Sequence, residues 1–173
     1  MPNHVRTVIK ISKIKPDDIS LILNLLATKE KGQIIIDFDK IKPEPRTINN
    51  CPEDYRITSA KEAYIEENDE RPWFNWYTWR ISHWGTKWEA YDGYTVIGKT
   101  YIKFIFSTAW SLADPIIQKL ASLGYDIDVK YADEAYGSNC GKLTYTSEQG
   151  WTYWNEFELK DPVRFARDLW NRY

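Results

Sequence analysis

The sequence predicts an α+β protein of the ferredoxin-like class, with an antiparallel sheet in the order βαββαβ and two helices on one face. Three observations lead to this fold. Strand and helix patterns alternate near both ends of the chain, a polar and tryptophan-rich insertion at about 46–86 follows the second strand, and extra strands and a terminal helix come last. Because 173 residues suffice for one core, we expect 1–173 to form a single domain.

The first half of the chain is predicted to begin as a β-α-β unit. Residues 4–13 alternate apolar and polar side chains, which is typical of a half-buried strand. Pro16 and the apolar stripe over 19–26 predict a helix that ends near Gly32. Residues 33–38 are rich in β-branched side chains and predict the second strand. Since a helix connects these two strands, we expect them to run parallel within one sheet.

The second half is predicted to continue the sheet. Residues 87–91 and 101–106 are expected strands, and Asp114 begins a helix that ends at Gly124. In the insertion we expect some helix at 58–67. Three tryptophans spaced three residues apart are expected along one side of another helix: Trp73, Trp76 and Trp79. Further strands and a last helix are expected at 127–131, 143–145, 151–155 and 161–173.

Composition and charge exclude several classes of protein. The net charge is −2, whereas a dedicated nucleic-acid binder is usually strongly basic. The charge is uneven, because 1–50 carry 9 basic and 6 acidic side chains and 126–158 carry 2 basic and 7 acidic ones. There is no membrane-length apolar run and no signal-peptide pattern, and Cys51 and Cys140 are too few for a disulfide framework. We expect a cytoplasmic protein with two free thiols, no metal, no cofactor and no membrane partner.

Several segments resemble one known family. They are Met1-Pro2-Asn3-His4-Val5, Asn75-Trp76, Trp84-Gly85-Thr86-Lys87-Trp88-Glu89-Ala90, Phe106-Ser107-Thr108-Ala109-Trp110-Ser111 with Pro115, and the spaced Tyr131, Glu134 and Gly137. These stretches are similar to the YubB-type ferredoxin-like family, whose members are small proteins of plasmids, phages and integrated elements. The resemblance implies a mobile-element protein with this fold, and it supplies no catalytic residue.

One string matches the letters of a phosphate-binding loop: Gly93-Tyr94-Thr95-Val96-Ile97-Gly98-Lys99-Thr100. Such a loop leads directly into a helix whose N-terminus faces the phosphates. Here the residues after Thr100 are Tyr-Ile-Lys-Phe-Ile-Phe, which predict a strand. We therefore interpret the string as a glycine-bounded connection between strands.

The leading functional hypothesis is a non-enzymatic protein that docks onto another protein. A core seldom needs nine tryptophans, and Trp, Tyr and Arg dominate interface hot spots. The acidic stretch could also complement the basic groove of a nucleic-acid enzyme. The expected partner is a host or rival-element protein, for instance a nucleic-acid-processing defence enzyme, and the protein would then be an anti-defence inhibitor such as an anti-CRISPR. The candidate partner-binding residues, some of them expected at the surface, are Trp79, Arg80, Trp84, Trp88, Asp133 and Glu134.

The first alternative is a protein that binds single-stranded nucleic acid or nucleotides. It would use the basic face of the first strand, Arg6 and Lys10, with aromatic side chains as stacking platforms. Tyr101 and Lys103 lie in a segment that weakly matches the recognition strand of RNA-binding domains. Such binding predicts an affinity that falls steeply with salt.

The second alternative is a small enzyme with a site around Asp37, Asp39 and His83. Carboxylates at the end of a strand can hold a metal or act as a base. The simpler interpretation is that both aspartates form strand-end hydrogen bonds. An active site would further require a concave pocket and carboxyl groups with perturbed pKa values.

Overall fold

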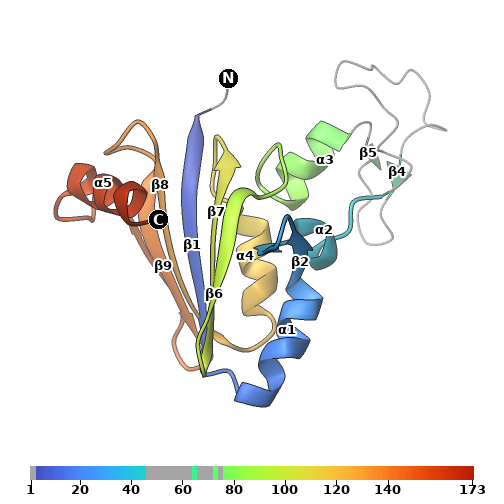
Figure 1. Ribbon diagram of the computed structural model, residues 1–173. Helices are drawn as coiled ribbons and strands as arrows, with labels where there is room; N and C mark the ends of the chain where they lie inside the picture. Colours follow the sequence, from blue (N-terminus) through green and yellow to red (C-terminus); the bar gives the residue numbers. More distant parts are fainter. Residues whose placement is uncertain (1–2, 46–63, 66–71, 74–75) are drawn as a thin grey trace.

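The computed structural model describes residues 3–45, 64–65, 72–73 and 76–173. Its centre is a six-stranded sheet in the order β10-β9-β8-β1-β7-β6, and every neighbouring pair is antiparallel (Figure 1). The bounds of the strands are β1 His4–Ser12, β6 Tyr91–Ile97, β7 Tyr101–Ala109, β8 Asp126–Asp133, β9 Cys140–Thr146 and β10 Gly150–Asn155.

Four of these strands and two helices reproduce the ferredoxin-like order. After β1 come a short turn of 3-10 helix, η1 (Pro16–Asp18), and α1 (Ile19–Leu26); after the β6–β7 hairpin, α4 (Asp114–Ala121) leads to β8. The order β8-β1-β7-β6 places the fourth, first, third and second strands side by side, which is the split β-α-β topology. The predicted fold class is therefore confirmed, with β9, β10 and a terminal helix as additions.

The segment expected as the second strand of the sheet lies elsewhere. β3 (Gln33–Ile36) pairs antiparallel with β2 (Ala27–Glu30) in a separate two-stranded sheet. The expectation that this segment shares a sheet with β1 and runs parallel to it is wrong, because in the described part of the chain β3 pairs only with β2. The helix also ends at Leu26, well before Gly32, since Lys31 and Gly32 adopt positive φ and form the turn of the β2–β3 hairpin.

The strand expected at 87–91 begins only at Tyr91, and it contains most of the phosphate-loop-like string. Residues 98–100 connect β6 to β7, and the Gly98 N–H donates to the Tyr101 carbonyl at 2.9 Å. The string is thus part of a β-hairpin, which confirms its interpretation as a connection between strands. Lys99 leads into β7 and not into a helix.

The helices are divided between the two faces of the sheet. In Figure 1, α1 and α4 lie on one side and α5 (Pro162–Arg172) lies on the other. The larger core lies under α1 and α4, where Ile9, Phe104 and Ile117 are buried. None of the described helices combines the length and the apolar composition needed to cross a membrane. The smaller core, under α5, consists of Val8, Ile105, Ala132, Cys140, Ala166 and Leu169.

Helix α2 (Phe38–Ile41) precedes the insertion, which contributes α3 (Trp76–His83) and a two-stranded sheet of β4 (Tyr64–Ile65) and β5 (Pro72–Trp73). Residues 64–65 are therefore strand, and the rest of the helix expected at 58–67 lies outside the described residues. Because Trp73 belongs to β5, the prediction of three tryptophans along one helix is wrong. Helix α3 begins at Trp76 and carries two of them.

Candidate functional site

One face of the sheet brings together the four residues predicted for nucleic-acid binding. Successive side chains of a strand point to opposite faces, so Arg6 and Lys10 of β1 lie away from the core under α1 and α4. Tyr101 and Lys103 of β7 share this face, and Lys10 and Lys103 lie directly opposite each other in the register. The first alternative of the sequence analysis thus corresponds to a contiguous surface.

Two further lysines extend this surface, and the sequence patterns did not single them out. Lys130 of β8 lies opposite Val8 of β1, and Lys142 of β9 lies opposite Lys130. Both lysines belong to the stretch 126–158. Because the net charge of this stretch is negative, it did not indicate a basic surface. The alternation of buried Ile127 and Val129 was the available signal, because it turns Lys130 to the opposite face.

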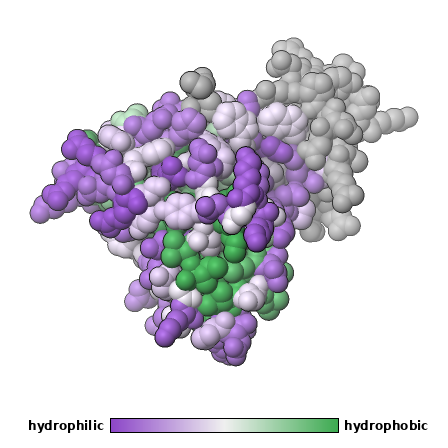
Figure 2. All heavy atoms as spheres, viewed as in Figure 1, coloured by the Kyte–Doolittle hydropathy of each residue, from purple (hydrophilic) through white to green (hydrophobic). Residues whose placement is uncertain are grey.

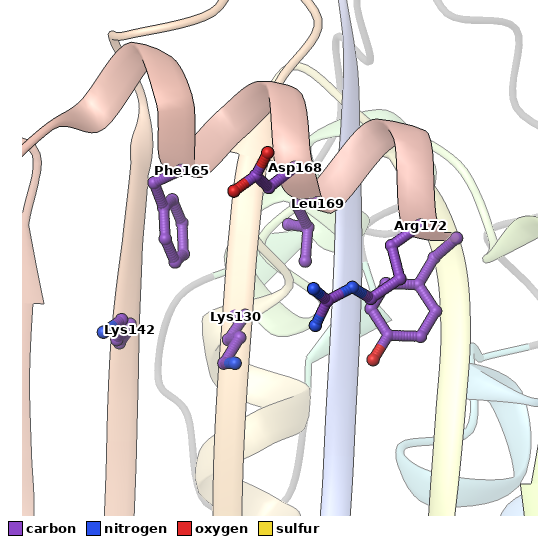
Figure 3. A pocket seen from close by; sticks show the side chains of 7 residues that line it. Lys130, Lys142, Phe165, Asp168, Leu169 and Arg172 are labelled. Atoms are coloured by element: carbon purple, nitrogen blue, oxygen red, sulfur yellow. The ribbon is translucent and has the colours of Figure 1, made fainter.

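Helix α5 forms a wall beside these lysines, as Figure 3 shows. A cavity of about 320 Å³ is lined by Lys10, Lys103, Lys130 and Tyr173, together with Val8 and Asp128. A second cavity, of about 160 Å³, shares Lys130 and Tyr173 with the first, so the two adjoin as one shallow groove. We call the surface around this groove the basic sheet face; it comprises Lys10, Tyr101, Lys103, Lys130, Lys142, Phe165, Arg172 and Tyr173.

The groove is positively charged. Five cationic side chains and two carboxylates line it, which gives a formal charge of +3. One carboxylate, Asp168, lies 3.8 Å from Arg164 of the same helix. Within the described part of the chain, none of the four lysines forms an ion pair with a carboxylate. Lysines that neutralise phosphates release the counter-ions condensed on a nucleic acid, so a charge of this sign favours such a ligand.

Aromatic rings accompany the lysines of this face. Rings offer flat apolar surfaces on which bases stack, while the adjacent cations can pair with phosphates. Three of the lysines place their ammonium groups within cation–π distance of a ring. The distances from Nζ to the ring centre are 5.3 Å for Lys10 and Tyr101, 5.4 Å for Lys103 and Tyr173, and 5.7 Å for Lys142 and Phe165.

Arg6 is half-buried against α5. Its Cζ lies 5.0 Å from the centre of the Trp170 ring, and its Nη1 donates to the Asp92 carbonyl at 3.0 Å. Burial lowers the pKa of Arg6, although the nearby Asp92 carboxylate opposes this effect. Arg6 therefore anchors α5 to the sheet, and its predicted role as a direct ligand contact has less support than that of Lys10.

The tryptophans at the centre of the docking hypothesis are buried. Trp79 and Trp84 are 0% and 1% exposed and belong to the larger core. Trp79 stacks on His83 with 4.4 Å between ring centres, and the Trp84 Nε1 donates to the Lys42 carbonyl at 2.9 Å. The expectation that either ring faces a partner is wrong, because their large apolar area fills the layer between α2, α3 and the sheet.

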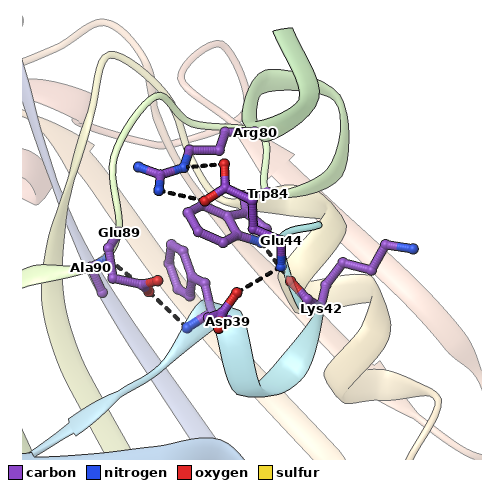
Figure 4. Close-up of polar contacts among 8 residues, drawn as sticks. Asp39, Lys42, Glu44, Arg80, Trp84, Glu89 and Ala90 are labelled. Carbon is purple, nitrogen blue, oxygen red and sulfur yellow. Dashed lines mark hydrogen bonds and ion pairs between the residues drawn. The ribbon is translucent and has the colours of Figure 1, made fainter. Parts of the chain in front are cut away.

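Arg80 is held by an ion pair inside this layer (Figure 4). Its Nε and Nη2 donate to the two carboxylate oxygens of Glu44 at 3.0 and 2.6 Å. Its Cζ also lies 4.6 Å from the centre of the Trp84 ring, and Glu44 is only 8% exposed. The charge of Arg80 is thus compensated within the chain, which makes this residue a structural clamp.

Glu89 lies close to the clamp and connects α2 to the start of β6 (Figure 4). Its Oε1 accepts the Phe38 N–H at 2.7 Å and the Ala90 N–H at 3.2 Å. Burial raises the pKa of Glu89 to about 7, although these two hydrogen bonds act in the opposite direction. This carboxyl group therefore titrates near neutral pH.

The other predicted partner-binding residues differ in exposure. Asp133 is 4% exposed and accepts the Ala135 N–H at 2.8 Å, so it organises the loop after β8. Glu134 is exposed and accepts the His4 N–H at 3.0 Å. Trp88 is 36% exposed. Of the six predicted residues, Trp88 and Glu134 are the two exposed ones.

A second aromatic group surrounds Lys87. Its Nζ lies 5.4–6.0 Å from the centres of four rings. Trp88 and Trp110 are 36% and 42% exposed. Trp110 follows β7 and is distant in sequence from the other three rings, so this group forms only in the folded chain. We call this group the aromatic rim; its members are Trp76, Tyr77, Lys87, Trp88 and Trp110.

The residues of the enzyme hypothesis have ordinary structural contacts. Asp37 accepts the Lys40 N–H at 3.0 Å and caps α2, and Asp39 accepts the Glu44 N–H at 2.6 Å. His83 shares a hydrogen bond of 2.9 Å with a backbone carbonyl of its own helix. Among the described residues, His, Cys, Asp and Glu side chains nowhere gather in a group of three that could hold a metal ion.

Cys140 is a free thiol in the smaller core, and burial raises its pKa, which disfavours the reactive thiolate. Cys51 lies outside the described residues, so the expectation of two free thiols is confirmed for Cys140 alone.

Close packing explains the two glycines of the phosphate-loop-like string. A Cβ at Gly93 would lie 2.6 Å from the Ile35 Cγ2 and 2.9 Å from the Ile105 carbonyl oxygen. A Cβ at Gly98 would overlap the Tyr101 ring. Gly93 therefore has no room for a side chain between β3 and the Ile105 backbone, whereas a side chain at position 98 would require the Tyr101 ring to move.

The surface of the molecule is divided in character. Figure 2 shows hydrophilic side chains over α5 and hydrophobic ones gathered over α1 and β6. The exposed large apolar side chains of these last two elements are Leu21, Leu25, Val96 and Ile97. The charged surface that suits an anionic ligand is thus separate from the most apolar one.

These observations define an α+β protein with ferredoxin-like strand order and a basic open sheet face. Residues 83–162 match the model of a family described as a ferredoxin-like domain in Api92-like protein. The matched segment contains α4 and the strands from β6 to β10, so it supports a ferredoxin-like domain. Neither the curated proteins nor the solved structures contain a match to the chain.

Proposed function

We propose that the protein binds single-stranded nucleic acid on the basic sheet face. The observation that carries this proposal is the row of four lysines, none with a carboxylate partner in the described part of the chain: Lys103, Lys10, Lys130 and Lys142. The row crosses four adjacent strands about 4.8 Å apart, so it extends over roughly 15 Å, which is long enough for several nucleotides.

A single strand fits this surface better than a duplex. The groove beside α5 is shallow and has Tyr173 and Phe165 within reach of the lysines. Unpaired bases can stack on such rings, whereas a duplex keeps its bases stacked on one another and would offer mainly phosphates. The proposal therefore assigns the phosphates to the lysines and the bases to the rings, in the cytoplasm and without a catalytic step.

The test is fluorescence anisotropy with short labelled oligo-dT and oligo-U strands over a range of salt concentrations. We expect log affinity to fall linearly with log salt, by a slope of about 0.7 for each phosphate contact. The double variant Lys103→Glu/Lys130→Glu should lose most of the affinity. The matched control, Lys29→Glu/Lys119→Glu, makes the same change of charge at exposed positions away from this face and should lose little. Flat binding curves for both strands at low salt would contradict the proposal.

A second candidate function is docking onto a protein through the aromatic rim. The exposure of Trp88 and Trp110 supports it, since Trp is among the residue types enriched in interface hot spots. The resemblance to the YubB-type family directs this candidate to a host or rival-element protein, for example a defence enzyme that processes nucleic acids. The protein would then act as a non-enzymatic anti-defence inhibitor such as an anti-CRISPR.

Affinity capture from a host that expresses its defence systems tests this candidate, together with the activity of those systems. The variant Trp88→Ala/Trp110→Ala should lose both capture and inhibition. Leu21→Ala/Leu25→Ala, which removes exposed apolar side chains elsewhere, should retain both. A protein that captures nothing and leaves the defence systems fully active rules the candidate out.

A further inference from the structure

The two edges of the six-stranded sheet differ in how they are protected. The β6 edge has a bulge between Tyr91 and Tyr94, and β3 lies along it, where the Thr95 hydroxyl donates to the Ile34 carbonyl at 2.6 Å. The opposite edge, β10, pairs with β9 in unbroken register and has no second neighbour in the described part of the chain. Proteins usually protect such an edge by proline, charge or a bulge. The sequence of β10, Gly-Trp-Thr-Tyr-Trp-Asn, contains neither proline nor charge.

The backbone of β10 presents hydrogen-bonding groups at this edge. In an antiparallel ladder, residues that bond to the neighbouring strand alternate with residues that face outward. The Asn155 N–H donates to the Glu158 carboxylate at 2.9 Å, and its carbonyl accepts the N–H groups of Glu158 and Leu159. Asn155 therefore faces outward. By the alternation, Trp151 and Tyr153 also direct their N–H and carbonyl groups to the open edge.

The outward N–H and carbonyl groups of one β10 strand can pair with the same groups of a second copy. In an antiparallel pair of two β10 strands with a twofold axis at Thr152, Trp151 lies opposite the partner's Tyr153, and their N–H and carbonyl groups bond reciprocally. Thr152 then lies opposite the partner's Thr152. Aromatic pairs and threonine pairs at such positions stabilise antiparallel sheets. Within one chain, Trp151 and Tyr153 already have ring centres 5.8 Å apart, and Tyr153 is 49% exposed.

We propose that two copies of this chain associate through β10 in this register. Within β10 no like charges face each other, because the strand is uncharged, and the pairing satisfies the outward groups of Trp151 and Tyr153 without disturbing the turn at Asn155. The twofold axis stands perpendicular to the sheet, so the product is one sheet of twelve strands with both basic sheet faces on the same side. The inference does not depend on the proposed ligand.

Sedimentation velocity of the full chain, without nucleic acid and over a range of concentrations, tests the proposal. The unmodified chain should form dimers. Thr152→Lys and Thr152→Glu each place like charges opposite each other at the axis, so each variant alone should raise the dimer dissociation constant by up to about fivefold. An equimolar mixture of the two should dimerise again, because Lys then faces Glu. Circular dichroism checks that each variant is folded.

The matched control is Thr144→Lys, which adds the same charge opposite Thr152 on β9, one strand away from the edge. It should dimerise like the unmodified chain. The proposal is overturned if the unmodified chain stays monomeric at all concentrations, or if Thr152→Lys alone dimerises as well as the unmodified chain. It is equally overturned if Thr144→Lys dissociates the dimer as strongly as Thr152→Lys.

Discussion

The basic sheet face and the buried layer between α2, α3 and the sheet both place cationic side chains next to aromatic rings. We call this layer, which contains Trp79, Arg80 and Trp84, the tryptophan layer; the two regions differ in burial and in charge compensation. In the layer, Arg80 lies 4.6 Å from the Trp84 ring and forms an ion pair with the buried Glu44. On the sheet face, Lys103 lies 5.4 Å from the Tyr173 ring, and no carboxylate among the described residues pairs with it. Cations next to aromatic rings therefore do not define a binding site by themselves. Burial and charge compensation distinguish the core from the candidate site.

The largest expected effect concerns the rings of the tryptophan layer. Trp84→Ala should lower the free energy of unfolding by about 3–5 kcal/mol, because it removes a fully buried ring and leaves a cavity. The matched change Trp88→Ala, at a ring that is 36% exposed, should cost clearly less. Urea denaturation measures both values. Equal losses would mean that these two rings do not differ in burial as described.

The ion pair of the layer gives the next largest effect. Arg80→Met should lower the free energy of unfolding by up to about 3 kcal/mol, since it leaves the Glu44 carboxylate buried without its partner. Lys103→Met, which keeps an apolar stem on the sheet face, should change stability by less than about 0.5 kcal/mol. Arg80→Met/Glu44→Met should recover part of the loss in the same urea experiment. A double variant less stable than Arg80→Met would argue against charge compensation as the cause.

The titration of Glu89 gives a pH-dependent difference between the two regions. Its pKa is raised to about 7 in the folded chain, against an ordinary value of 4.5. Between these values the folded state keeps a proton that the unfolded state has lost, so stability should fall as pH rises from about 4.5 to 7 and then level off. We expect this carboxyl group to contribute roughly 2–3 kcal/mol to the fall.

Glu89→Gln isolates this contribution, because the amide carbonyl can still accept the Phe38 and Ala90 N–H groups. The variant should be more stable than the unmodified chain at pH 8 and should lack this part of the pH dependence. Thermal unfolding from pH 4.5 to 8 measures both properties. Parallel pH profiles for the two proteins would show that Glu89 does not titrate in this range.

The smallest expected effect concerns a single charge of the basic sheet face. Lys130→Ala should weaken oligo-dT binding by about 1 kcal/mol and reduce the salt slope by about 0.7, which corresponds to one phosphate contact. Stability should hardly change, because Lys130 is exposed. Anisotropy titrations at several salt concentrations give the slope. An unchanged slope would place the phosphates away from Lys130.

Much of the architecture follows from local patterns. The alternation within β1, β7 and β8 and the apolar stripes of α4 and α5 predicted these elements, because strand and helix periodicities depend on neighbours in the chain. The same alternation placed Lys10 and Lys103 on solvent-facing positions. The same reasoning would have found Lys130 and Lys142 if the charges of the stretch 126–158 had been assigned separately to the two faces of its strands.

The pairing of strands and the burial of rings depend on residues that are distant in sequence. β3 and β6 are both strand-like, yet β6 pairs with β7 because residues 98–100 connect them as a hairpin. Trp79 and Trp84 are buried and Trp110 is exposed because α2 and α3 cover one part of the sheet and leave another open. Local preferences act between neighbours along the chain, and they set the elements and the side to which each side chain points. Whether a side chain is buried depends on how all the elements pack together. Only the tertiary structure therefore distinguished the buried core from the exposed candidate site.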